Sequence, residues 1–343
     1  MQKQDKKSDF NEDARQKIKE NKKGWEKVQI PSRWVDGNFP FNFSTYIDKN
    51  IGIIFFITGL IVPFFSGLVL RLAFSLDGGF SDGLGLINLA ISIVSNGIGF
   101  FIIWDKRRSL MFKTTLFMYY AYVVLPIVLS LLLSPIGFLG IPDYWTSSIL
   151  LLIQAIVLLT LIYWVFSRVD ELKSRVYKTL KQNFKMLLLV AAIGAASIFI
   201  LSLIYGTISS ALGFSQNNSE NQESLVRPLT QGNLGSQILY IISLFVFTVI
   251  VAPLMEEIVF RDGVFTGASN RWIGWIMSAV LFAYIHISAT GDFEHLLEYL
   301  IAGIVLATAF NICRGNVTYT WFIHATSNLI SFIMILVSVY AIN

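Results

Sequence analysis

Long apolar stretches separated by short polar segments dominate the hydrophobic pattern of this chain from residue 51 onward. A helix crosses the hydrocarbon core of a bilayer with about 20 mostly apolar residues. Stretches of this kind occur at 51–70, 84–103, 112–134, 148–167, 186–206, 236–257, 272–290, 296–312 and 320–342. The first and eighth are the weaker candidates, because Arg71 directly follows one and Glu298 lies within the other. The pattern predicts an all-α, polytopic transmembrane helical bundle with about nine spans.

The positions of Lys and Arg predict the orientation of these spans. Residues 1–50 hold eleven of them, Asp105–Arg108 reads DKRR, and 168–185 holds six against two acidic residues. The intervening loops are nearly free of basic residues. Cytoplasmic loops carry an excess of Lys and Arg, so the N-terminus is predicted to be cytoplasmic. Contact of the basic segments with anionic lipid headgroups is a less favoured interpretation.

Composition supports a membrane protein and excludes other classes. Hydrophobic residues make up 55% of the 343 residues and charged residues 14%, whereas soluble domains carry about 25% charged residues. The formal net charge of +4 reflects the sorting of basic loops, and no nucleic-acid partner is predicted. The predicted location is a cell (plasma) membrane. The hydrophilic first fifty residues show no cleavable signal peptide.

The chain divides into four predicted segments. Residues 1–50 form a cytoplasmic polar and basic tail, frayed or disordered over 1–30, with an aromatic segment at the membrane interface over 31–48. Residues 51–206 form N-terminal transmembrane helices that are almost purely apolar. Residues 207–235 form a polar loop, and 236–342 hold all three histidines. The last segment is therefore predicted to carry the chemistry.

The string Glu256-Glu257-Ile-Val-Phe-Arg261 places three ionisable residues in or near a span. Each costs roughly 2.5–3.5 kcal/mol there, so such residues usually face a cavity or a partner. Glu257 and Arg261 are four residues apart and can form an ion pair. Glu256 is turned about 100° away and is a candidate general base. The alternative is a cluster at the membrane boundary, where both acids meet water.

Histidines provide two further strings. His286 lies one helical turn after Phe282, and a lone His on an apolar face is most often a hydrogen-bonded core residue. His324 and Asn328 also lie one turn apart, so both could bind a metal, hold a water or stabilise an oxyanion. The alternative for this pair is a polar clamp between helices. His295, in the loop GDFEH, is expected to be exposed and receives no role.

These strings, EExxxR, FxxxH and HxxxN in that order, resemble the CAAX-protease and bacteriocin-processing family of intramembrane proteases. This family is also called the Abi or type II CAAX prenyl endopeptidase family. The resemblance covers roughly 236–335 and implies a CAAX-protease-like core in the C-terminal half. The activity that it implies is hydrolysis of peptide bonds in membrane-associated peptides or proteins.

The resemblance also implies roles for individual residues. Glu256 and His286 would activate the attacking water, His324 and Asn328 would complete the site, and Glu257, Arg261 and Phe282 would support it. Members are commonly labelled metalloproteases, so a divalent metal such as zinc could be held by Glu256, His286 and His324. A glutamate mechanism without a catalytic metal is the other reading, and both stay open.

Helix geometry sets one condition on this site. Glu256 and His286 can meet only if the sixth span continues past Arg261, or if 262–272 forms a short reentrant turn. Gly263 and Gly267 permit either arrangement.

The sequence indicates the class of substrate only in general terms. A composition rich in Ile, Lys, Asn and Phe favours a bacterial source, in which prenylated substrates are not expected. Pheromone precursors, bacteriocin-type peptides or membrane anchors are the better candidates. A non-catalytic membrane scaffold is the main alternative function. A transporter is a third, although the N-terminal spans lack the charged residues typical of one.

Overall fold

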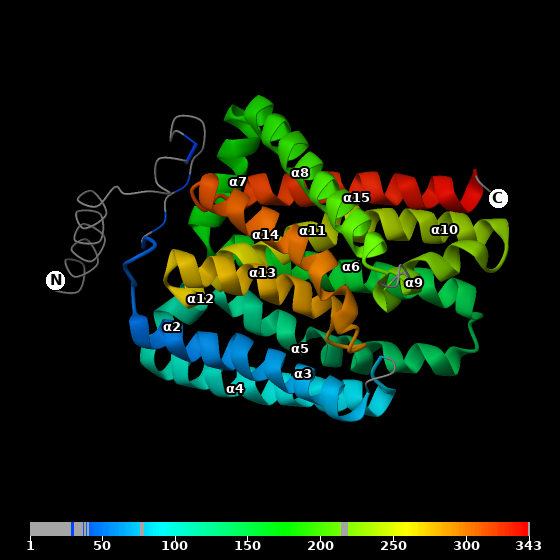
Figure 1. Ribbon diagram of the computed structural model, residues 1–343, viewed down its shortest axis with the longest axis horizontal. Helices are drawn as coiled ribbons and strands as arrows, with labels where there is room; N and C mark the ends of the chain where they lie inside the picture. Colours follow the sequence, from blue (N-terminus) through cyan, green and yellow to red (C-terminus); the bar gives the residue numbers. More distant parts are fainter. Residues whose placement is uncertain are drawn as a thin grey trace.

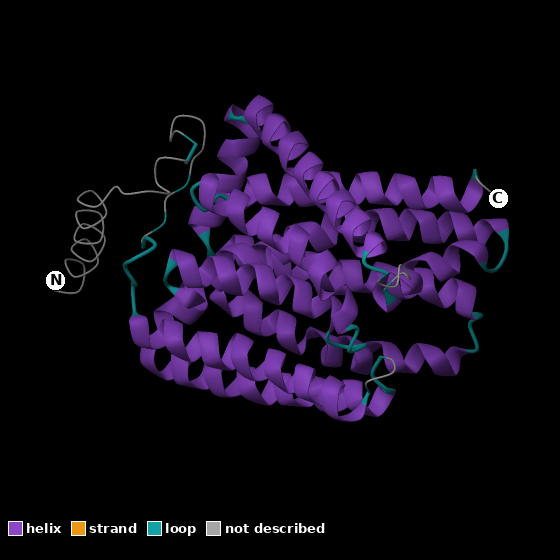
Figure 2. Cartoon of the chain, in the orientation of Figure 1, coloured by secondary structure: helices purple, strands orange, loops and turns teal. Residues whose placement is uncertain are grey.

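The computed structural model describes residues 29–30, 37, 39, 41–75, 79–213 and 219–341. Most of the predicted tail, and part of the segment predicted to lie at the membrane interface, fall outside these residues. Within the described part of the chain, the secondary structure is helical and contains no strand (Figure 2). The all-α prediction is confirmed.

The N-terminal helices are α2 (Lys49–Phe56), α3 (Val62–Phe74), α4 (Asp82–Lys113), α5 (Leu116–Leu133), α6 (Asp143–Arg168), α7 (Asp170–Gln182) and α8 (Phe184–Ala211). The C-terminal helices are α9 (Glu220–Val226), α10 (Leu234–Phe245), α11 (Ala252–Glu257), α12 (Val264–Ala268), α13 (Arg271–Ile287), α14 (Leu296–Ile312) and α15 (Val317–Tyr340). Short π-helical segments join α2 to α3 and connect α10, α11 and α12 into one continuous rod.

Seven helical rods of the described chain are long and apolar enough to cross a membrane. They cover Lys49–Phe74, Asp82–Lys113, Asp143–Arg168, Phe184–Ala211, Leu234–Ala268, Phe293–Ile312 and Val317–Tyr340. The remaining two predicted spans coincide with shorter apolar helices at Leu116–Leu129 and Arg271–Ile287. A polytopic bundle is confirmed, and the count of nine stays a prediction.

The rods lie side by side along the long axis of the molecule, and α8 crosses the others obliquely (Figure 1). The turns at 105–115, 168–184, 269–271 and 312–316 lie at one end, which we call the basic end. It carries Lys106, Arg107, Arg108, Lys113, Arg168, Lys173, Arg175, Lys178 and Arg314. Hydrogen bonds join its parts, including one from Arg175 Nη1 to the Gly315 carbonyl (2.9 Å).

The opposite end, which we call the acidic end, consists of 75, 79–82, 135–143, 219–233 and 288–298. Its acidic residues are Asp82, Asp143, Glu220, Glu223, Asp292, Glu294 and Glu298, and Arg227 is the one Lys or Arg residue in these described segments. Arg71 is buried there and pairs with Glu294 at 3.2 Å. The cations on which the predicted orientation depends therefore gather at one end of the bundle, and the orientation itself stays a prediction.

Two segments that the sequence predicts to be loops are largely helical. Residues 168–185 contain α7, which buries Leu172 and Val176 against the bundle. Within 207–235, α8 continues to Ala211, and α9 and a 3₁₀ turn at Arg227–Thr230 follow. The overall polarity of 168–185 concealed an amphipathic pattern, in which Leu172, Val176 and Leu180 recur at four-residue spacing on one helix face.

His295 is a third correction. The sequence predicts it to be exposed, but only 7% of the residue is accessible, and its Nδ1 lies 3.1 Å from Glu298 Oε1. The 3₁₀ turn Phe293–His295 folds this residue inward at the start of α14.

Close contact between α13 and α14 fixes the position of the C-terminal half. A Cβ at Gly303 would lie 2.5 Å from the Ala279 carbonyl oxygen, so only glycine permits this approach. The main core beneath it is aromatic and aliphatic, with Phe55, Met255 and Phe265 almost fully buried. Phe39, from the segment predicted to lie at the interface, also packs into this core.

Candidate active site

The rod formed by α10, α11 and α12 carries the two glutamates away from its ends. Pro253 lies within this rod and has no N–H to donate to the Val249 carbonyl four residues earlier. The π-helical segment Val246–Val251 occupies this turn, and a second one, Ile258–Gly263, follows the glutamates. Single π turns inside α-helices are frequent at functional sites. The rod continues to Ala268, so of the two arrangements that the sequence permits the structure has the continued helix and not the reentrant turn.

Glu257 and Arg261 form a buried ion pair, as their spacing predicts. The carboxylate Oε2 accepts from Arg261 Nε at 2.9 Å, and both side chains are 0% exposed. Arg261 Nη1 also donates to the backbone oxygen (3.0 Å) and hydroxyl (2.6 Å) of Ser278 on α13. Its guanidinium lies 4.8 Å from the centre of the Phe282 ring. The pair therefore ties the rod to α13 in a site without water access.

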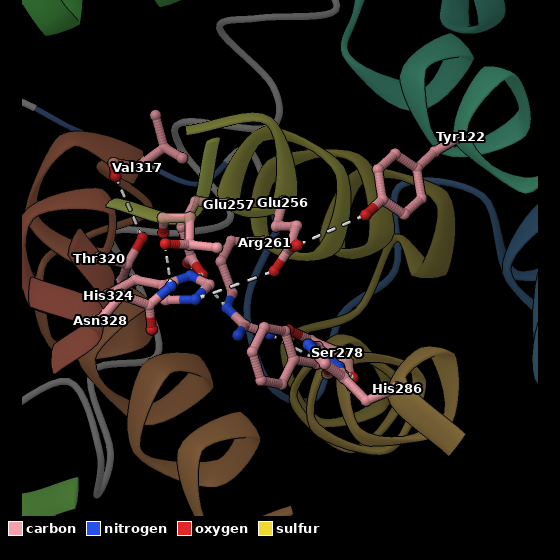
Figure 3. A network of polar contacts seen from close by, with 12 residues as sticks. Tyr122, Glu256, Glu257, Arg261, Ser278, His286, Val317, Thr320, His324 and Asn328 are labelled. Atoms are coloured by element: carbon pink, nitrogen blue, oxygen red, sulfur yellow. Dashed lines mark hydrogen bonds and ion pairs between the residues drawn. The ribbon is translucent and has the colours of Figure 1, made fainter. Parts of the chain in front are cut away.

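His324 on α15 lies between the two glutamates (Figure 3). Its Nδ1 is 3.1 Å from Glu257 Oε1, and its Nε2 is 3.9 Å from Glu256 Oε2. Because Glu257 is acceptor-only, Nδ1 carries the proton, and in the neutral ring Nε2 presents a lone pair toward Glu256. The gap to Glu256 exceeds a direct hydrogen bond and is of the kind that a water can bridge.

Glu256 is the more accessible of the two glutamates, with 13% of its side chain exposed. Its Oε2 faces His324, and its Oε1 is 3.5 Å from the Tyr122 hydroxyl on α5. Arg261 neutralises Glu257 directly, whereas Glu256 has a tyrosine and an imidazole as neighbours. This difference between adjacent carboxylates gives Glu256 the freer lone pairs.

His286 lies near the end of α13, on the other side of Phe282. Its Nδ1 donates to the Phe282 carbonyl at 2.7 Å, which leaves Nε2 as the acceptor in the neutral ring. The ring stacks on Tyr299 of α14 at 4.6 Å. Phe282 contacts both imidazoles, with its ring centre 4.9 Å from His286 and 5.4 Å from His324. Phe282 thus separates the two histidines.

Asn328 lies one turn beyond His324 on α15. Its Nδ2 donates to the Thr248 carbonyl at 2.8 Å. Thr248 belongs to the π segment before Pro253, where the regular ladder of hydrogen bonds is disturbed. Asn328 therefore fastens α15 to the irregular turn that precedes the glutamates.

The expected metal set does not assemble in this conformation. Across the described residues, no group of three His, Cys, Asp or Glu side chains is placed to hold an ion. Both oxygens of Glu257 are engaged, and Phe282 stands between the rings of His286 and His324. A divalent metal bound by Glu256, His286 and His324 stays a prediction, and no step below uses one.

The sequence did not reveal that Tyr122 would contact Glu256 or that Tyr299 would stack on His286. The tyrosines of MYYAYVVLP are expected to serve packing, and Tyr119 fits this by donating to the Gly59 carbonyl (2.8 Å). Tyr122, however, reaches Glu256 across 134 residues of sequence. Nothing local distinguishes it from its neighbours, because only the packing of α5 on the rod brings the two together.

Comparison of the sequence with known proteins identifies a related family. The family model described as "Type II CAAX prenyl endopeptidase Rce1-like" matches residues 238–330. An uncharacterized protein of Mycoplasma capricolum is 32% identical over 316 residues, which cover 89% of this chain and 93% of that protein.

Two proteins of Lactococcus lactis match a shorter region. The UPF0177 protein YxdF is 34% identical over 80 residues, or 23% of this chain and 43% of YxdF. The UPF0177 protein YbdI is 29% identical over 85 residues, or 25% of this chain and 45% of YbdI. No solved structure matches the chain.

Proposed function

The chain belongs to the Rce1-like family of type II CAAX prenyl endopeptidases, and from this premise we propose that it is an intramembrane endopeptidase with Glu256 as its general base. The observation that carries the assignment of roles is the position of His324 between the two glutamates. An ionisable group in a membrane-spanning region is taken as a candidate functional residue unless shown otherwise. Here four such groups lie next to one another: Glu256, Glu257, Arg261 and His324.

In the proposed reaction, Glu256 and His324 Nε2 hold one water between them. Glu256 takes a proton from this water as its oxygen attacks the carbonyl carbon of the peptide bond. The C–N bond then breaks, and the proton passes from Glu256 to the leaving nitrogen. Water is consumed, and a carboxyl group and an amine are formed.

The remaining polar residues support this step. Glu257 holds His324 in the required tautomer, and Arg261 balances the charge of Glu257. Arg261 Nη2 has no hydrogen-bond partner among the described groups, but the side chain is fully buried, so the guanidinium acts on the site through its pairing with Glu257 and not by contact with the substrate. The family resemblance implies that His286 activates the water together with Glu256 and that Asn328 completes the site. We give the first of these roles to His324 instead, because its Nε2 lies 3.9 Å from Glu256 Oε2.

Replacement of Glu256 by Gln tests this proposal. The change removes the base but keeps the shape, so peptide cleavage should fall about 10²–10⁴-fold at unchanged protein level. The measurement is mass spectrometry of membrane peptides in a deletion strain that expresses either the wild-type chain or Glu256→Gln. Precursors that accumulate only with the variant would identify the substrates.

The matched control is Glu223→Gln, on the exposed surface of α9 at the acidic end. It should cleave as the wild type does. A non-catalytic scaffold makes the opposite prediction, because it would tolerate Glu256→Gln and His324→Gln and fail when apolar contact residues are changed. Full complementation by both of those variants would refute catalysis.

A further inference from the structure

A cavity of about 840 Å³ between α4, α5 and α13 is not used by this reaction scheme. Its mouth is formed at the acidic end by residues that include Phe80, Asp82 and Thr290. Its inner end is formed by Tyr122 and Phe260, whose rings are 5.6 Å apart. A cavity of this volume falls within the range of ligand sites.

The inner wall of the cavity adjoins the proposed base. Tyr122 lines the cavity and also brings its hydroxyl to 3.5 Å from Glu256 Oε1, as Figure 3 shows. Phe260 follows Glu256 by one helical turn. Whatever fills the cavity therefore ends one side chain away from the proposed site of chemistry.

Polar groups mark the cavity at successive depths along α4. Asn88, Ser92 and Asn96 are spaced one turn apart and line the same cavity. Asn96 is only 3% exposed, and its Oδ1 has no hydrogen-bond partner among the described groups. A buried unpaired acceptor is unfavourable, so this oxygen is available to accept a hydrogen bond from a donor group inside the cavity. A lipid acyl chain has no such donor, whereas a polypeptide backbone presents one N–H per residue.

Charge is confined to the mouth. The charged residues that line the cavity are Asp82 and Glu220, both exposed, and those lining its depth are uncharged. From Asp82 to Asn96 the helix rises about 21 Å, which matches about six residues of extended chain. The walls therefore suit an extended, uncharged segment that carries a cation near the mouth.

We propose that this cavity is a substrate subsite that admits an extended, uncharged polypeptide segment with a basic flank from the acidic end of the bundle. The inference rests on the proposed peptidase function for the fate of the bound segment, which would be cleaved where it meets Tyr122 and Glu256. With the predicted orientation, substrates would enter from the non-cytoplasmic side.

A single engineered cysteine tests access to the cavity. The native Cys313 is 1% exposed, and burial raises the pKa of its thiol to about 12, so it gives little background. Ser92→Cys in the full chain, expressed in intact cells, should react with a membrane-impermeant cationic methanethiosulfonate added outside. The anionic reagent should react about tenfold more slowly, because an acidic mouth concentrates cations. Asp82→Asn with Glu220→Gln should abolish this preference.

Protection by a peptide tests the ligand class. A decapeptide with two lysines followed by Ala, Ser and Leu residues should slow labelling of Ser92→Cys, and its counterpart with two glutamates should protect less. The control is Val94→Cys on the same helix, which is 63% exposed on the outer surface of the bundle and should stay unlabelled in lipid.

The peptidase function and the substrate subsite can be tested independently. Labelling and protection are also measured with Glu256→Gln, which should bind the peptide without cleaving it. Protection without any cleavage by the wild type would contradict the peptidase and leave the subsite. Absence of labelling in both intact and permeabilised cells would overturn the subsite. Labelling that no peptide slows would also overturn it, and this is the result expected if lipid fills the cavity.

Discussion

At the scale of single residues, two adjacent glutamates have opposite surroundings. Glu257 is fully buried and binds a cationic Arg261 on one oxygen and His324 on the other. Glu256 is partly accessible, and its nearest approach to His324 is 3.9 Å, which is longer than a hydrogen bond. Adjacent positions on a helix point about 100° apart, which allows one carboxylate to be structural and the other reactive.

Glu257→Gln should destabilise the protein by about 3–5 kcal/mol, because it leaves Arg261 as a buried charge without its partner. Glu256→Gln should leave stability nearly unchanged. The measurement is thermal unfolding of the purified variants in one detergent. In the double variant Glu257→Gln with Arg261→Gln, much of the lost stability should return. Equal unfolding temperatures for Glu257→Gln and the wild type would show that the pair does not stabilise the fold.

At the scale of elements, the irregular rod from α10 to α12 positions the site. A regular α-helix of the same length would rotate the glutamates relative to Thr248 and the residues before it. The π segments on either side of α11, with Asn328 bound to the Thr248 carbonyl, hold a different register. The register of α12 therefore differs from the one that a regular helix starting at α10 would give it.

Pro253→Ala tests this view of the rod. The change restores an N–H and should allow the turn to tighten, so stability should stay the same or rise. Cleavage should fall about 10²-fold, since misplacement by about 1 Å can cost that much. Cleavage rates and unfolding temperatures are compared with those of Pro142→Ala, a proline that precedes α6 away from the site. Full activity in Pro253→Ala would show that the π turn is not required.

At the scale of the whole molecule, charge divides the bundle into two ends. Cations gather where α4, α7 and α12 end, and acids gather around the mouth of the cavity. The orientation of these two ends across the membrane is open to a direct test.

Lys106→Cys at the basic end should be protected from an impermeant thiol reagent in intact cells, and Glu223→Cys at the acidic end should react. Permeabilised cells should label both. The reason is that a basic end is retained in the cytoplasm during insertion. The reverse pattern would invert the topology, and the cavity would then open toward the cytoplasm.

The sequence by itself determined the features that depend on neighbouring residues. Apolar length predicted the membrane-spanning helices, and the i,i+4 spacing predicted the pair of Glu257 and Arg261. Its errors lie where local polarity was misleading. His295 is buried and not exposed, and residues 168–185 and much of 207–235 are helical.

Only the tertiary structure decided which helices meet. His324 reaches Glu257 across 67 residues of sequence, and Tyr122 reaches Glu256 across 134. Such contacts depend on how helices pack, and in a bundle where every helix is apolar the hydrophobic pattern does not distinguish the face that meets lipid from the face that meets a neighbour. For the same reason the sequence did not reveal the cavity between α4, α5 and α13, because its walls come from helices far apart in the chain.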